Sequence, residues 1–366
     1  MLQTNMNSVN TMRRCVLLSI LLAIVVIGLG AYTRLTHAGL GCPDWPTCYG
    51  LLDVPQTSEQ IAIAEREFPE RAVEIQKAWN EMIHRYFAGS LGFLIAFITY
   101  FAIKIRFTNK LSQATTEKTP LLLPIAILIV VSFQAALGMW TVTMKLMPVV
   151  VMGHLLGGFT TLCLLFLLYL RLRKFDQNNL NDTYQPSSLE SPTIQSFKKY
   201  VGFAFLGIVI LAAQIALGGW TSSNYAALSC VELPICQGDW QNQLSFSKAF
   251  TLLPPAKESY EFGHLDYNER MTIHVAHRIG AIITTVYLAW LAIILFKQFP
   301  LRSIKSACAI LMLVLIVQVS LGISNIWFKL PLNVAVAHNL VAALLMLSLL
   351  SLTYQLTQRT RGISNE

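Results

Sequence analysis

Charged side chains are scarce in this chain. They make up 13% of its 366 residues, against about 25% in a typical soluble domain. The sequence also lacks a Walker loop, a dinucleotide-binding fingerprint and a nucleophile elbow, so it shows no sign of the chemistry that these motifs support. Hydrophobic residues make up 54% of the chain instead, and the mean hydropathy is +0.54. The composition predicts an integral membrane protein.

Long apolar runs recur along the chain, each of about 20 residues and therefore long enough to cross a bilayer as a helix. No small-residue cleavage site follows the first run before Thr33-Arg34, which favours a retained helix over a signal peptide. We therefore predict an all-α membrane protein with eight transmembrane helices. The runs cover residues 15–33, 84–103, 121–143, 150–170, 200–222, 273–296, 307–327 and 332–354.

The net charge of +8 does not indicate a nucleic-acid partner, because the basic residues follow the membrane topology. With both termini in the cytoplasm, more than half of the 27 Lys and Arg fall on the cytoplasmic side. This distribution obeys the positive-inside rule. It predicts that the long loops 34–83 and 223–272 lie on the outer side of the membrane.

The two halves of the chain repeat each other. Four spans per half is an even number, so both halves enter the membrane in the same direction. This predicts two four-helix bundles related by a pseudo-two-fold axis along the membrane normal. We expect a bundle over residues 1–175, a cytoplasmic linker over 176–199 and a second bundle over 200–366. The matched elements are Leu29-Gly30 before Cys42 with Leu217-Gly218 before Cys230, Glu81-x-x-His84-Arg85 with His274-x-x-His277-Arg278, and Gln134 and Gln318, each 20 residues before a histidine.

Four histidines mark the outer ends of the even-numbered spans, and all four are expected at a similar depth. Histidines on facing helices of a bundle commonly hold haem iron through two imidazoles. Two histidines per half predict one bis-histidine haem site per half. The alternative is that each is an interfacial side chain bonded to a carbonyl. The predicted ligands are His84, His154, His277 and His338.

The residues beside the predicted ligands leave several interpretations open. Arg85 and Arg278 follow ligands directly, and each guanidinium suits either pairing with a haem propionate or reaching outward to water. Glu81 lies one turn before His84, and its counterpart is His274. A carboxylate there suits proton relay or stabilisation of a developing cation, and equally an N-terminal charge favoured by the helix dipole. If both halves bind haem through the same arrangement of residues, their chemistry should differ where Glu81 in one half is replaced by His274 in the other.

The outer loops contain two Cys-x5-Cys pairs. Four cysteines on the outer side fit disulfides in an oxidising compartment such as a periplasm. A structural disulfide and a redox-active pair both fit this spacing. Zinc is not indicated, because neither pair has further ligands at the usual spacing. The pairs are Cys42 with Cys48 and Cys230 with Cys236.

The combination of these motifs resembles the haem A synthase family. The similarity covers nearly the whole chain, and the eight-span duplicated layout also matches. No single motif is specific, but their combination is. The motifs are the stretch from Thr33 to Pro46 (TRLTHAGLGCPDWP), Glu81-x-x-His84-Arg85, Gly153-His154, His277-Arg278 and His338-Asn339.

The resemblance implies a reaction, namely oxidation of the C8 methyl of haem O to a formyl group, which gives haem A for terminal oxidases. It implies that the N-terminal half holds the substrate haem and the C-terminal half a haem b. It also implies a catalytic role for Glu81, iron ligation by the four histidines, and the same two cysteine pairs. We further expect a bacterial inner membrane with the sites toward the periplasm. The expected partners are a haem O synthase, an electron donor that the sequence does not identify, and a second copy of the chain in a homo-oligomer.

Two other function classes also fit a pair of bis-histidine sites. A dihaem b-type electron-transfer cytochrome usually stacks its haems across the membrane, whereas these four histidines are expected near one face. A haem transporter or chaperone would need a releasable ligand, which nothing in the sequence separates from a synthase. The identity of the bound haems distinguishes all three.

Overall fold

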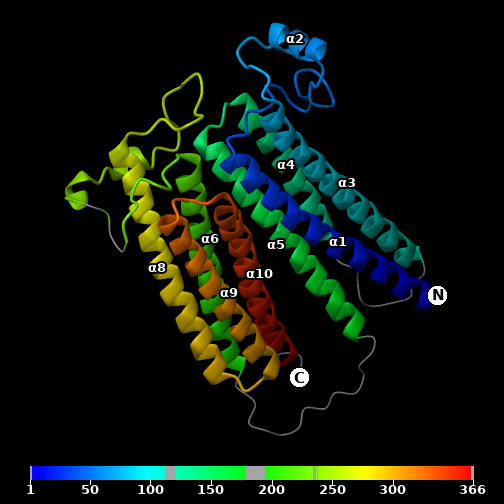
Figure 1. The fold of residues 1–366 in the computed structure, drawn as a ribbon. Coiled ribbons are helices and arrows are strands. Elements are labelled where there is room, and N and C mark those ends of the chain that lie inside the picture. The colour runs from blue at the N-terminus through cyan, green and yellow to red at the C-terminus, as the bar shows by residue number, and fades with distance from the viewer. Residues whose placement is uncertain (1, 112–120, 179–193, 234–235, 237, 364–366) are drawn as a thin grey trace. The chain divides into compact units, whose positions relative to one another are not determined.

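The computed structural model describes residues 2–111, 121–178, 194–233, 236 and 238–363. Over these residues the chain is helical, with no strand, and Figure 1 shows long helices joined by loops. Eight helices are long and apolar enough to cross a membrane, and each coincides with one predicted apolar run to within a residue or extends beyond it, which confirms that prediction. They are α1 (Leu2–Leu35), α3 (Ile75–Leu111), α4 (Leu122–Thr143), α5 (Pro148–Asn178), α6 (Ile194–Ser223), α8 (Tyr267–Gln298), α9 (Arg302–Trp327) and α10 (Leu332–Ile363).

Three short helices lie in the long loops: α2 (Ser58–Glu67), η1 (Trp240–Gln243) and α7 (Phe246–Ala249). Thr57 starts α2 with a capping box, in which the Thr57 side chain accepts from the Gln60 backbone N–H and the Gln60 side chain reaches back. Pro69 follows the end of α2, in keeping with a residue that cannot continue a helix. The next helix, α3, begins at Ile75.

The chain divides into two compact units. Unit 1 comprises Met1–Leu146 and Gly153–Pro186, and unit 2 comprises Met147–Met152 and Ser187–Glu366. The predicted linker over 176–199 begins and ends in helix, because α5 continues to Asn178 and α6 starts at Ile194, and its residues 179–193 lie outside the described part. The predicted domain bounds, the pseudo-two-fold axis and the cytoplasmic termini stay predictions.

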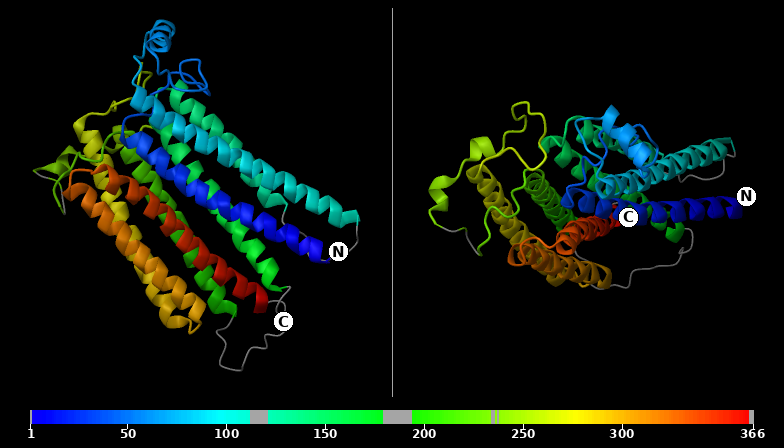
Figure 2. Two further views of the ribbon diagram at one scale, coloured as in Figure 1. Left: turned by 45° about the vertical axis from the view of Figure 1, so that its right-hand side comes forward. Right: turned by 45° about the horizontal axis from the view of Figure 1, so that its top comes forward.

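Within unit 1, α3 packs against both α1 and α4, and the Gln134 side chain of α4 hydrogen bonds the backbone of α5. Within unit 2, α6 and α9 each pack against α8 and α10, so the four helices close a ring. Figure 2 shows the helices of each unit running alongside one another over most of their length. Apolar side chains fill each unit, among them Leu165 and Leu168 in unit 1 and Leu291 and Leu311 in unit 2.

Candidate functional site

Each of the four predicted histidine ligands lies with its ring edge against a glycine on the preceding transmembrane helix. An ideal Cβ on these glycines would approach the histidine Cε1 to between 3.0 and 3.4 Å. It would touch the ring at Gly138 and press it back by a few tenths of an ångström at the other three. The absence of a side chain at these four positions therefore lets each imidazole lie directly against a helix backbone. The pairs are Gly30 with His84, Gly138 with His154, Gly218 with His277, and Gly322 with His338.

In unit 1 the structure brings His84 of α3 and His154 of α5 together. Their ring centroids are 6.4 Å apart and their planes are nearly perpendicular, at 87°. Two metal–imidazole bonds of about 2 Å each, with the ring radii at either end, would separate the centroids by about 6 Å. The spacing therefore fits one metal ion held between the two rings, as in a bis-histidine haem site.

In unit 2, His277 of α8 and His338 of α10 lie close enough to interact electrostatically. A glutamine approaches each of them. The Gln214 side-chain nitrogen donates to the His277 carbonyl at 3.0 Å and lies 3.1 Å from His277 Nδ1. The Gln318 side-chain nitrogen lies 3.3 Å from His338 Nε2. All four predicted ligands are half-buried. The structure places His84 near His154 and His277 near His338, and their role as iron ligands stays a prediction.

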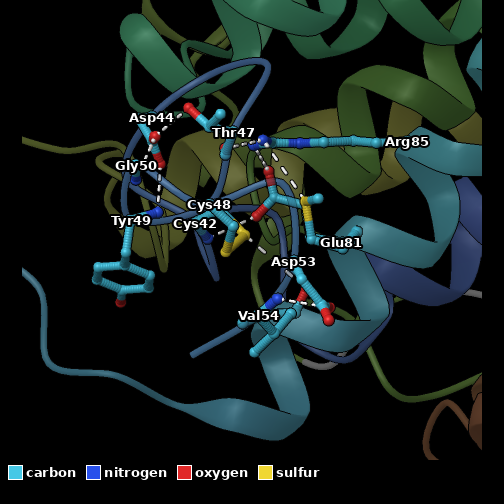
Figure 3. The surroundings of a disulfide bond; sticks show 12 residues. Cys42, Asp44, Thr47, Cys48, Tyr49, Gly50, Asp53, Val54, Glu81 and Arg85 are labelled. Atoms are coloured by element: carbon cyan, nitrogen blue, oxygen red, sulfur yellow. Dashed lines mark hydrogen bonds and ion pairs between the residues drawn. A yellow bond between two sulfur atoms is a disulfide. The ribbon is translucent and has the colours of Figure 1, made fainter. Parts of the chain in front are cut away.

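Glu81 is buried, with 5% of its surface exposed, and both carboxylate oxygens are engaged. Oε2 accepts a hydrogen bond from the Cys42 backbone N–H at 3.0 Å, and Oε1 lies 2.5 Å from Arg85 Nη2 in an ion pair. Figure 3 shows the carboxylate between the disulfide loop and the Arg85 guanidinium. A buried carboxylate is stable only with such partners. The counterpart His274 is also buried, at 4% exposure, so both halves have an ionisable side chain at this position.

Arg85 and Arg278 make the same kind of contact in the two units. Arg85 Nη1 donates to the Thr47 carbonyl at 2.6 Å. Arg278 donates to the carbonyls of Glu232 at 2.7 Å and Cys230 at 2.5 Å. Each arginine therefore ties its helix to the neighbouring disulfide loop. Pairing with a haem propionate stays a prediction.

Both cysteine pairs form disulfides, Cys42–Cys48 and Cys230–Cys236. The first belongs to a small buried cluster with Tyr49, Val54, Ala64, Ala78 and Met82. Figure 3 shows Asp44 organising this loop, where its carboxylate accepts hydrogen bonds from the Tyr49 and Gly50 backbone N–H groups and from Thr47 Oγ1. Burial raises the pKa of the Tyr49 phenol to about 12, so its hydroxyl stays protonated and donates to the Ala72 carbonyl.

The contacts of the glutamines with the histidines and of the arginines with the loop carbonyls were not expected from the sequence. The sequence did contain one pattern that could have predicted the glutamine contacts. A glutamine stands four residues before three of the four glycines that face a histidine. These are Gln134 before Gly138, Gln214 before Gly218 and Gln318 before Gly322. The arginine contacts had no comparable signal, since the fold of the loops decides them.

The helices define a multi-pass membrane protein, and in unit 1 the spacing of His84 and His154 suits a metal ion between them. The profile of a family described as cytochrome oxidase assembly protein matches residues 13–350, and this chain belongs to that family.

Relatives of this chain carry a more specific name. A haem A synthase of Shewanella oneidensis is 46% identical over 347 residues, which cover 95% of this chain and 97% of the relative. Haem A synthases of Chelativorans sp. and Mesorhizobium japonicum are each 26% identical, over 91% and 88% of this chain and 86% and 84% of their own lengths.

Proposed function

We propose that this chain is a haem A synthase, an enzyme that oxidises the C8 methyl of haem O to a formyl group and so gives haem A for terminal oxidases. The observation that carries the proposal is the facing pair of His84 and His154, 6.4 Å apart, one helical turn from the buried Glu81. The near full-length similarity to haem A synthases supports the same activity.

In this proposal the two units hold different haems. His84 and His154 bind the substrate haem in unit 1, and His277 and His338 bind a haem b in unit 2. The bound iron supplies the redox chemistry when present. The chain itself orients the imidazole rings, because the glycines that face the histidines let each imidazole lie against a neighbouring helix.

Glu81 acts as the proton-handling group of unit 1. Glu81 lies one turn before His84 on α3, which would suit a proton relay to the edge of a haem held there. The Cys42 N–H and the Arg85 guanidinium fix its two oxygens in place. In unit 2 His274 occupies this position, so we assign that unit the supporting role.

We place the protein in a bacterial inner membrane with both termini in the cytoplasm and the histidine sites toward the periplasm. The two bundles would be related by a pseudo-two-fold axis along the membrane normal. A haem O synthase would deliver the substrate, an electron donor would complete the redox cycle, and the chain would form a homo-oligomer. The distribution of basic residues supports the sidedness.

The test is the identity of the haems in purified protein. We expect haem O or haem A together with haem b when the chain is produced in cells that make haem O, measured by pyridine haemochrome spectra and mass analysis. His154→Ala should remove the haem O and haem A, and the matched His338→Ala should remove haem b. Haem b alone in the unaltered protein would contradict the proposal and favour an electron-transfer cytochrome or a haem carrier.

A further inference from the structure

Three of the four histidine-facing glycines are preceded, one helical turn earlier, by a glutamine, and the fourth is preceded by Val26. The glycine at each position lets a histidine reach the helix, and residues four apart share a face of that helix. The residue one turn earlier therefore points toward the same histidine. The histidines and the residues that face them in this way are His84 with Val26, His154 with Gln134, His277 with Gln214, and His338 with Gln318.

Two of the glutamines make the same contact. Gln134 donates to the His154 carbonyl at 2.8 Å, and Gln214 donates to the His277 carbonyl at 3.0 Å. The space for each amide comes from a second glycine three residues after the histidine. A Cβ on Gly157 or Gly280 would overlap the Gln134 or Gln214 amide.

Gln318 approaches its histidine differently. Val341 stands where the other two pairs have a glycine, and the Gln318 amide lies against the imidazole of His338 instead, 3.3 Å from Nε2. All three glutamines thus hold a histidine, either through its backbone or through its ring. Both histidines of unit 2 are held in this way.

Unit 1 is asymmetric, because the Val26 side chain has no polar group. The Val26 backbone hydrogen bonds His84, as the backbones of Gln134 and Gln318 do with their histidines, but no side-chain amide is added there. The Nδ1 atoms of His84, His154 and His338 are all buried without a hydrogen-bond partner in the described part of the chain. The hydrogen bonding of Nδ1 therefore does not distinguish His84 from the other histidines, whereas the absence of a glutamine side chain beside it does. Groups around a ligating histidine fix its ring orientation, and their loss weakens binding of the metal.

We infer that Gln134, Gln214 and Gln318 are positioning residues for the histidine ligands, and that His84 is the ligand that gives way when haem enters or leaves unit 1. The inference rests on the proposed function, because an enzyme must exchange its substrate haem and retain its cofactor haem. Unit 2, with both ligands held, has the arrangement suited to retention. Unit 1, in which a glutamine side chain holds only one of the two ligands, has the arrangement suited to exchange.

The test compares haem release from full-length purified protein into excess apomyoglobin. We expect two phases, assigned to the units with His154→Ala and His338→Ala, with unit 1 releasing faster. Val26→Gln should slow the fast phase by about threefold to tenfold, the effect of one added hydrogen bond. Val26→Leu, which adds similar bulk without an amide, is the matched control and should leave that phase unchanged. Equal slowing by both variants would overturn the inference.

The Gln318→Leu variant gives a second, independent test, which remains informative even if the Val26→Gln variant does not fold. It should accelerate the slow phase by about threefold to tenfold. It should also speed carbon monoxide binding to the reduced haem of unit 2, since that binding requires an axial histidine to leave. An unchanged slow phase and an unchanged binding rate would refute the role of the glutamines. Finding haem b alone in the purified protein would contradict the proposed function itself. Finding both haems, with unchanged rates of haem release and carbon monoxide binding in the variants, would contradict only this inference.

Discussion

The loops that follow α1 and α6 each contain a disulfide and the same local turn, in which Gly41 N–H bonds the Ala38 carbonyl and Ser229 N–H bonds the Ala226 carbonyl. They differ in how closely they approach the next helix. A Cβ on Gly41 would lie 2.6 Å from the Lys77 carbonyl and 2.7 Å from the Ala78 nitrogen. The first loop therefore needs glycine to lie against α3, whereas its counterpart has the side chain of Ser229.

This difference shows how one repeated frame can support two roles. The close approach of the first loop brings the Cys42 N–H to Glu81 and gives unit 1 an oriented, buried carboxylate. The second unit has a histidine at the matching position and a loop that does not require this approach. Under the proposed function, unit 1 would be the half adapted for chemistry and unit 2 the half adapted for holding a haem.

Replacing Glu81 should produce the largest effect. Glu81→Gln keeps the size of the side chain but removes its ability to take up or release a proton, and we expect haem A formation to fall by about 100-fold or more. Both haems should remain bound. The matched variant His274→Gln should retain most of the conversion rate. Equal losses in the two variants, measured as haem A formed per bound haem O, would remove the distinction between the units.

Exchanging Gly41 and Ser229 between the two loops tests whether the close approach of the first loop to α3 is needed for haem A formation. Gly41→Ser gives the first loop the residue of the second and forces it away from α3, because backbone atoms occupy the space. We expect a loss of about 1–3 kcal/mol in stability together with reduced haem A formation. Ser229→Gly is the control and should leave haem A formation intact. Thermal inactivation in detergent and haem analysis measure both effects, and a fully active Gly41→Ser enzyme would argue against the close approach.

Removing each disulfide should separate stability from chemistry. Both pairs have the same sequence separation of 6 residues, so either double Cys→Ser variant should lose about 2 kcal/mol of stability through loop entropy. Only Cys42→Ser with Cys48→Ser should also slow haem A formation, since only that loop bonds Glu81. Slowing of the same size after Cys230→Ser with Cys236→Ser would point to a redox function common to both pairs.

The smallest effect is expected at Tyr49. Tyr49→Phe removes the hydrogen bond to the Ala72 carbonyl and should cost about 1 kcal/mol. Because the folded pKa is raised from 10.0 to about 12, the unfolded chain loses this proton first, and stability should fall as pH rises from 10 toward 12. Alkaline thermal melts should show a shallower decline in Tyr49→Phe than in the unaltered protein. Parallel curves would contradict this assignment.

The features that sequence predicted are those that depend on composition and spacing along the chain. Apolar runs located all eight spans, and the repeat located the four histidines that the structure pairs within each unit. The start of α3 was less predictable: it lies at Ile75 and not near residue 84, because Gln76, Lys77 and Asn80 are helical but not apolar. Hydropathy marks the part of a helix that suits the membrane and not where the helix begins.

The unpredicted contacts depend on how helices rotate and on how loops fold. The distance of 20 residues from Gln134 to His154 was visible, but the contact requires two helices to present these faces to each other. Arg85 bonds loop carbonyls because Asp44 turns the chain there, and no periodicity reports such a turn. Side-chain hydrogen bonds to distant backbone therefore needed the structure.

The glycine against each histidine also limits how these helices can move. Residues one helical turn apart share a face, and a turn rises about 5.4 Å, so sliding α1 along α3 by one turn would bring Val26 or Arg34, instead of Gly30, toward the His84 ring. A Cβ at that contact would already stand 3.0 Å from the imidazole. Axial sliding is thus blocked by steric overlap, whereas separation of the helices or rotation of the ring is not. Any opening of unit 1 should therefore proceed by spreading of its helices, with their vertical register preserved.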